Sequence, residues 1–286
     1  MSAQPWAVLT ALAVLTLGGC NSSSNSSSPA PTPTPDKGNA ALEKAFPLHT
    51  SVFGVSIRAT SNIDKAKMLH AANVMAQYLD NDENGLADNQ AVVEALVNKR
   101  ATLIMVPDEA DLETVGEGLP QGGAFQDLYG SEVHPQGSTP GQFDATLEEV
   151  LHLITHEGYA SVYPKIFGEV AESQIADAMD QARGGRFESI PASYPDGAWY
   201  TYDDESCDYS CMVTEYTYWA LTSLLGGQSH PGRLQEIEHE WKLNTPDKVK
   251  LGDSAVYTLL TNGEYGLATV LPDGHYDYQT FTISGD

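Results

Sequence analysis

The sequence predicts an α+β fold in which helices dominate a single domain and the sheet is small. Two short segments have the composition of strands, and most of the remaining segments have apolar residues at helical spacing. The order of strand, helix, strand and then mostly helices is typical of α+β domains. A chain of 286 residues with 41% hydrophobic residues has enough apolar side chains for a buried core.

The first half of the chain supplies both predicted strands. Alternation of apolar and polar residues indicates one strand, and a short apolar run that ends at Pro107 indicates a second, buried one. Residues 116–141 are rich in Gly and Pro and are expected to form a long loop with short extended pieces. The strands are predicted over 51–59 and 101–106, and helices over 63–79 and 89–98.

The second half of the chain is expected to be helical. Two of its helices are followed by a pair of glycines, Gly184-Gly185 and Gly226-Gly227, which is a typical helix end. The helices are predicted over 145–159, 173–183, 212–225, 234–243 and 254–260.

The N-terminus has the pattern of an exported protein. Residues 7–17 form an apolar run that is too short to span a membrane as a helix, and it leads into Leu17-Gly18-Gly19-Cys20. This motif resembles a bacterial lipobox, although residues 1–6 lack the basic residues that usually begin such signals. The resemblance implies that residues 1–19 are a signal peptide and that Cys20 carries the lipid. An ordinary signal peptide is the alternative.

A tether is expected between the lipid and the folded domain. Residues 20–39 are rich in Ser, Pro and Thr, which favours a flexible to semi-rigid linker, and the domain is predicted over 40–286. The anchor implies the membrane as a partner and the cell envelope as the location. Asn21 is not the Asp that retains some lipoproteins at the inner membrane, so the outer membrane is favoured. A protein or peptide of the envelope is a possible further partner.

The charge of the chain narrows the classes of ligand. It has 39 Asp and Glu residues against 14 Lys and Arg residues, a formal net charge of -25. Such a charge repels phosphate, so no nucleic-acid partner is expected. The same excess of carboxylates favours divalent cations as ligands.

Two cysteines remain beyond Cys20. Cys207 and Cys211 are close enough in sequence to be bridged in a turn, and an oxidising envelope favours their disulfide. A metal role for the pair is the alternative, although the chain has no second pair of cysteines to complete a zinc site.

Residues 80–88 form an acidic loop between the first two predicted helices. Oxygen-bearing side chains fall at loop positions one, three, five and nine, and a glycine at position six allows a sharp turn. The loop resembles the first part of an EF-hand, but Ala91 replaces the glutamate of position twelve. The resemblance implies a structural Ca²⁺ site, and a solvated acidic turn is the alternative. The expected ligands are Asp80, Asp82, Asn84, the carbonyl of Leu86, and Asp88.

The predicted helix 145–159 carries the residues that are most suited to chemistry. Residues one helical turn apart can bind one metal ion, which pairs Glu148 with His152. Residues 148–152 resemble the His-Glu-x-x-His motif of zincin metallopeptidases, with Glu in place of the first His. The gluzincin subgroup takes a third ligand from a Glu on a later helix. The resemblance therefore implies a zincin-like fold, Glu148, His152 and Glu215 as ligands of Zn²⁺ or Mn²⁺, and Glu149 as general base.

Other roles for these residues are open. The metal site can be lost while the zincin-like fold is kept, which would abolish catalysis. Separately, the carboxylates of the helix can simply be solvated and His152 can be a core histidine. The chain has two Glu-x-x-His pairs, which is also the pattern of di-iron four-helix bundles. The predicted strands, however, are foreign to such a bundle. Tyr209 and Tyr216 lie near Glu215 in the sequence and are candidate proton donors. The di-iron ligands would be Glu149–His152, Glu236–His239, Glu94 and Glu215.

These patterns predict a lipid-anchored envelope lipoprotein with a calcium-binding, zincin-like domain. A non-catalytic or catalytically altered binding module is favoured, and an active metal-dependent peptidase or hydrolase with Glu149 as base is the alternative. One geometric requirement separates them, because only the enzyme needs Glu148, His152 and Glu215 to converge on one metal ion.

Overall fold

The structure is a computed structural model that describes residues 37–116 and 123–285. The predicted signal peptide, Cys20 and nearly all of the predicted tether lie outside the described residues. In the described part helices predominate over one small sheet, so the predicted α+β class is confirmed. No helix in that part is both long and apolar enough to cross a membrane.

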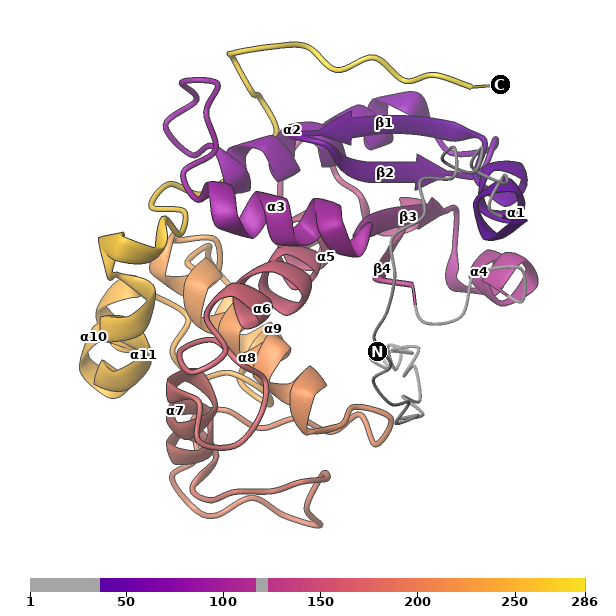
Figure 1. Cartoon of the computed structure of the whole chain (residues 1–286). Helices are drawn as coiled ribbons and strands as arrows, with labels where there is room; N and C mark the ends of the chain where they lie inside the picture. Colours follow the sequence, from indigo (N-terminus) through magenta and orange to yellow (C-terminus); the bar gives the residue numbers. More distant parts are fainter. Residues whose placement is uncertain (1–36, 117–122, 286) are drawn as a thin grey trace, which may run out of the picture.

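One mixed sheet organises the first half of the domain. Its strands are β1 (Leu48–Val52), β2 (Val55–Ala59), β3 (Thr102–Val106) and β4 (Phe125–Tyr129), in that order across the sheet (Figure 1). β1 and β2 are antiparallel, whereas β2, β3 and β4 run parallel. Parallel neighbours need a crossover, which α2 (Lys65–Leu79) and α3 (Gln90–Lys99) supply between β2 and β3.

The prediction of one strand over 51–59 is wrong, because the chain turns back in its middle. β1 and β2 pair as a hairpin in which Val52 lies opposite Val55. Phe53 and Gly54 make the two-residue turn, with φ angles of 50° and 88°. Positive φ at both positions gives the turn the twist that a tight hairpin needs. The alternation of apolar residues continues through the turn and therefore hides it.

Alternate residues of β3 pack on opposite faces of the sheet, as expected for a strand that is buried on both sides. Leu103 and Met105 belong to the main core, and Ile104 and Val106 belong to a smaller one. The smaller core is covered by α1 (Lys37–Ala45) and α4 (Glu109–Gly116), neither of which the sequence patterns indicated.

Five predicted helices are confirmed with small shifts at their ends. The predicted ranges are 63–79, 89–98, 173–183, 212–225 and 254–260, and the helices are α2, α3, α7 (Gln174–Arg183), α8 (Tyr209–Leu224) and α11 (Ser254–Leu260). Helices α7, α8 and α11, together with α9 (Arg233–Ile237) and α10 (Pro246–Gly252), form a layer away from the sheet (Figure 1). α5 (Thr146–Leu153) connects the two parts, because it contacts both β4 and α8.

Two predicted helices differ from expectation. The helix predicted over 145–159 is α5 followed by a π-helical turn, η2 (Ile154–Tyr159), and by α6 (Ala160–Val162). The helix predicted over 234–243 ends early, as α9, because the chain pairs Trp241 with Tyr200 in an antiparallel bridge. The predicted loop 116–141 contains β4 and the 3₁₀ turn η1 (Gly130–Glu132), and η3 (Gly263–Tyr265) follows α11.

The C-terminal strap, residues 269–285, crosses back over the first half of the domain. It runs along α2 toward β1 (Figure 1). His49 and Ser284 exchange two backbone hydrogen bonds of 2.9 Å each, which attaches the end of the strap to the edge of the sheet.

Candidate metal centre

α5 begins at a buried aspartate that fixes its direction. Oδ1 of Asp144 accepts hydrogen bonds from the backbone N–H of His134 at 3.0 Å and from the Thr146 hydroxyl at 2.8 Å. Its Oδ2 lies 2.7 Å from Nε2 of His70 on α2. These contacts tie the start of α5 to α2 and thereby determine where the next turn of α5 projects.

α8 begins at a disulfide. Cys207 and Cys211 are joined with an S–S distance of 2.01 Å, so the predicted bond is confirmed. Asp208 between them accepts a hydrogen bond from the backbone N–H of Cys211 at 3.0 Å and caps the helix. The cap and the disulfide fix the first turn of α8, and Glu215 lies further along the same helix.

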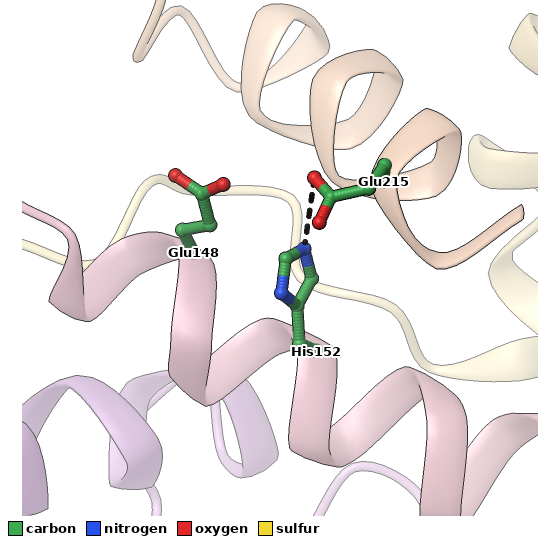
Figure 2. A group of neighbouring side chains, drawn as sticks. All are labelled: Glu148, His152 and Glu215. Carbon is green, nitrogen blue, oxygen red and sulfur yellow. Dashed lines mark ion pairs between the residues drawn. The ribbon is translucent and has the colours of Figure 1, made fainter. Parts of the chain in front are cut away.

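The three predicted metal ligands converge between α5 and α8. Glu148, His152 and Glu215 each offer a ligand atom, and these atoms all lie within 4.8 Å of one another. Nε2 of His152 lies 3.6 Å from Oε2 of Glu215. Figure 2 shows the imidazole of His152 pointing from α5 toward α8, with the Glu148 and Glu215 side chains on either side of its tip. The geometric requirement that separates the two functional hypotheses is therefore met.

One atom at this point lacks a hydrogen-bond partner. Within the described part of the chain, Nε2 of His152 is buried and makes no hydrogen bond, although it faces the carboxylate of Glu215. A buried polar nitrogen without a partner costs free energy unless a ligand satisfies it. An imidazole nitrogen and carboxylate oxygens are donors that Zn²⁺ and Mn²⁺ accept, so the residues fit a divalent ion.

Burial also shifts the pKa values of the ionisable groups at the centre. Burial raises the pKa of Glu215 to about 8; His152 opposes this shift, and repulsion from Glu148 and Glu149 adds to it. Burial, followed by the charge of Glu149, raises the pKa of Glu148 well above its usual range. Burial lowers the pKa of His152, so the imidazole is held neutral. A divalent cation bound here would favour the charged form of these carboxyl groups, because carboxyl ligands bind metal in the deprotonated form.

Glu149, the predicted general base, lies on the other edge of the imidazole. Its Oε2 is 3.4 Å from Nδ1 of His152 and accepts a hydrogen bond of 2.6 Å from Nε2 of Gln126 on β4. Burial, then the charges of Asp127 and Glu132, raise the pKa of Glu149 well above its usual range. Glu149 thus adjoins the centre from the side of the sheet, and its role as a base stays a prediction.

A tyrosine that sequence reasoning missed completes the centre. Tyr218 is fully buried on α8, its ring packs edge-on against His152 with centroids 5.5 Å apart, and its hydroxyl lies beside the carboxyl group of Glu148. The two tyrosines chosen from the sequence are engaged elsewhere: Tyr209 donates to Asp180 and Tyr216 donates to Asp253. The spacing of three residues between Glu215 and Tyr218, one helical turn, is the signal that could have identified it.

His156 and the di-iron candidates Glu94, Glu236 and His239 do not join the group of potential ligands. His156 lies in η2, where Nδ1 pairs with Glu169, and its side chain is about half exposed. Glu236 pairs with Arg233, His239 lies against Glu240, and Glu94 accepts from Gln90. Among the described residues, the groups of three or more potential metal ligands are Glu148–His152–Glu215 and Asp80–Asp82–Asp88.

The second group lies in the acidic loop between α2 and α3. Asp80, Asp82 and Asp88 offer ligand atoms that lie within 4.8 Å of one another. Asp80 is fully buried and accepts hydrogen bonds from the backbone N–H groups of Asn84 at 3.1 Å and Gly85 at 2.8 Å. Gly85 has the positive φ, 86°, that the predicted sharp turn requires.

Other oxygen-bearing side chains of this loop are hydrogen-bonded within the protein. Asn84, a predicted ligand, accepts a hydrogen bond from the backbone N–H of Leu86 at 2.9 Å, so its oxygen is used within the loop. Glu83 accepts from Gln77 and from the backbone of Asp277 in the strap. The hydroxyl of Tyr276 donates to Asp80, so the strap holds the loop through buried contacts that sequence reasoning did not predict.

Comparison with known proteins adds no relative from which a function could be transferred. No protein-family model, no curated protein and no solved structure matches the chain. The side-chain geometry of the centre between α5 and α8 is therefore what indicates a function.

Proposed function

We propose that this protein is a lipid-anchored envelope lipoprotein whose zincin-like domain is a metal-dependent hydrolase, with peptide bonds as the substrate class. The observation that carries the proposal is the convergence of Glu148, His152 and Glu215 around the unpartnered Nε2 of His152. Three protein ligands are the usual number at catalytic zinc sites, which keep one position for water or substrate, whereas structural sites have four.

Glu148, His152 and Glu215 would hold Zn²⁺ or Mn²⁺. Two carboxylates and one imidazole form a harder donor set than that of gluzincins, so the site accepts Mn²⁺ as well as Zn²⁺. A bound ion would supply Lewis-acid polarisation of a carbonyl group and of water. Glu149, which borders the centre, is the candidate group for accepting and returning a proton, because its carboxyl group lies 3.4 Å from His152 and burial raises its pKa above the ordinary value.

A non-catalytic, metal-stabilised binding module is the second candidate, and the position of Glu149 favours it. Metal-bound histidines usually donate their other ring N–H to a carboxylate, and Glu149 lies 3.4 Å from Nδ1 of His152. If Glu149 only orients His152, the centre has no base. The module would then bind a protein or peptide of the envelope without cleaving it.

The loop of residues 80–88 is proposed to bind Ca²⁺ for stability in either case. Its three carboxylates are hard oxygen donors, and the backbone N–H groups that bind Asp80 arrange the loop around them. Because the strap bonds to Asp80 and Glu83, a bound ion would stabilise the loop and the strap together.

The hydrolase proposal is tested with the full-length protein in detergent, loaded with Zn²⁺ or Mn²⁺ and mixed with a fluorogenic peptide library. Glu149→Gln is the test variant. Glu157→Gln is the matched control, because Glu157 lies in η2 and its carboxylate pairs with Lys99. We expect hydrolysis by wild type and by the control, and a loss of about 10²–10⁴-fold in Glu149→Gln with metal retained. Metal binding without hydrolysis would overturn the hydrolase proposal and leave the binding module.

A further inference from the structure

Behind Glu148, buried polar side chains form a chain of hydrogen bonds that leads away from the metal centre. Its members are Arg233, Gln228 and Tyr218, and Gln228 and Tyr218 are fully buried. Nε of Arg233 donates to Oε1 of Gln228 at 2.7 Å, and Nε2 of Gln228 donates to the Tyr218 hydroxyl at 3.2 Å. The Tyr218 hydroxyl in turn lies beside the carboxyl group of Glu148, and its ring packs against His152 with centroids 5.5 Å apart.

The direction of every bond in this chain is fixed by chemistry. A guanidinium can only donate, so the end of the Gln228 amide that faces Arg233 must be the oxygen. The NH₂ end must then face Tyr218. Thr222 gives an independent check: its hydroxyl donates to the backbone carbonyl of Tyr218 at 2.7 Å, so it can only accept from Nε2 of Gln228, at 3.0 Å.

This polarity determines what Tyr218 does for Glu148. A phenol has one hydrogen, and the NH₂ group of Gln228 cannot accept it. The hydrogen of Tyr218 is therefore left for a carboxylate oxygen of Glu148, which would act as its acceptor. Arg233 is itself held in place, because its guanidinium lies over the ring of Phe143 at 4.3 Å and pairs with Glu236 at 3.2 Å.

We propose that Gln228 is a positioning residue of the metal centre, which, through Tyr218, orients Glu148 as a carboxylate ligand. The inference rests on the proposed metal centre. Partners of this kind, which hold a ligand from behind, typically change metal affinity by about 10–100-fold when they are lost. Gln228 lies beyond the end of α8 and touches no proposed ligand directly, so no motif in the sequence indicates this role.

The test variants change the donors and acceptors of these hydrogen bonds and leave the shape of the side chains nearly unchanged. Gln228→Glu keeps an acceptor for Arg233 but places a second acceptor against Tyr218, so the hydroxyl hydrogen can turn away from Glu148. Tyr218→Phe removes the hydrogen altogether. Tyr216→Phe is the matched control, because Tyr216 is a buried tyrosine of α8 that donates to Asp253. Ser223→Ala removes another buried hydrogen bond of α8, from Trp241.

Zn²⁺ alone is the probe, measured as a dissociation constant for the full-length protein by competition with a chelator. The absorption spectrum of the Co²⁺-substituted protein reports the ligand arrangement. We expect Gln228→Glu and Tyr218→Phe each to weaken Zn²⁺ binding by about 10–100-fold and to change the Co²⁺ spectrum. The double variant should be no weaker than Tyr218→Phe, because both act through one hydrogen bond. Tyr216→Phe and Ser223→Ala should bind as wild type does.

The outcomes separate failure of the inference from failure of the metal centre. If wild type binds Zn²⁺ and loses it in His152→Ala, but both test variants bind with wild-type affinity and spectrum, the role of Gln228 is overturned. If Gln228→Glu does not fold, the Zn²⁺ affinity and the Co²⁺ spectrum of Tyr218→Phe decide whether the inference stands. If wild type shows no binding that depends on His152, the proposed metal centre fails and the inference fails with it.

Discussion

Oδ2 of Asp144 and Nε2 of His70 lie 2.7 Å apart, and both side chains are buried. The pair joins α2 to the residue that starts α5, and α5 carries two of the three proposed metal ligands. The metal centre therefore depends on a buried pair that contacts none of its ligands.

Loss of Asp144 is expected to destabilise the domain strongly. Asp144→Ala leaves His70, the N–H of His134 and the start of α5 without their acceptor, which should cost about 2–4 kcal/mol of unfolding free energy. Asp64→Ala is the control, because Asp64 caps α2 in an exposed position, and it should cost only about 1 kcal/mol. Urea unfolding at pH 7 measures both values, and equal costs would contradict the role given to Asp144.

Asp144 should also make the unfolding free energy depend on pH in the acid range. Burial by itself raises the pKa of Asp144, but the hydrogen bond and charge of His70 outweigh burial and hold that pKa below its ordinary value. Its stabilisation is therefore present above the ordinary aspartate pKa of about 3.9 and is lost as the pH falls through the lower pKa of the folded protein. The difference in unfolding free energy between wild type and Asp144→Ala should shrink below pH 4. A difference that stays constant would refute this assignment.

Glu132 should make the stability of the fold depend on pH in the opposite direction to Asp144. Burial, then the charges of Asp127, Glu109 and Asp108, raise its pKa to about 7, and its buried Oε2 has no hydrogen-bond partner among the described residues. A raised carboxyl pKa favours the folded state at low pH, and this contribution is lost as the pH rises toward 7 and above. Glu132→Gln should therefore be more stable than wild type at pH 8 and no more stable at pH 4.

The pH dependence of thermal unfolding from pH 4 to 8 checks this prediction. Glu113→Gln, at an exposed position of α4, is the control and should follow wild type at every pH. A wild-type protein that loses no stability relative to Glu132→Gln as the pH rises would show that Glu132 is not held in the protonated form.

Calcium should protect the C-terminal strap from proteolysis. The strap is held on the acidic loop by Tyr276 and by the backbone of Asp277, so an ion that orders the loop should also order the strap. We expect chymotrypsin to cleave the strap near Tyr276 and Tyr278 faster in EGTA than in Ca²⁺. Asp82→Ala should be cleaved rapidly under both conditions, and Asp204→Ala, a change in another acidic loop, should behave as wild type. Cleavage that is independent of Ca²⁺ in wild type would count against a calcium site.

The sequence allowed the long helices to be predicted because their apolar periodicity is carried by local residues. It also predicted that Glu148, His152 and Glu215 come together, since a short motif names two of them and a later aromatic helix supplies the third. The hairpin at Phe53 and Gly54 escaped prediction because strand alternation continues through the turn.

What the sequence could not predict depends on contacts between distant segments. The π-helical turn η2 moves His156 out of the face on which a regular helix would place it with Glu149 and His152. The contact of Gln126 with Glu149 requires β4 to lie beside α5, and only the tertiary fold brings them together. Likewise, Gln228 reaches Tyr218 because the chain folds back after α8.

The metal content of the purified full-length protein tests the central claim most directly. Elemental mass spectrometry should find Zn or Mn in wild type, in Asp82→Ala and in His156→Ala, whose histidine lies in the adjoining turn and outside the ligand group. His152→Ala should lose that metal while it keeps calcium. Wild type without a transition metal, or His152→Ala with the same content as wild type, would contradict a metal centre between α5 and α8.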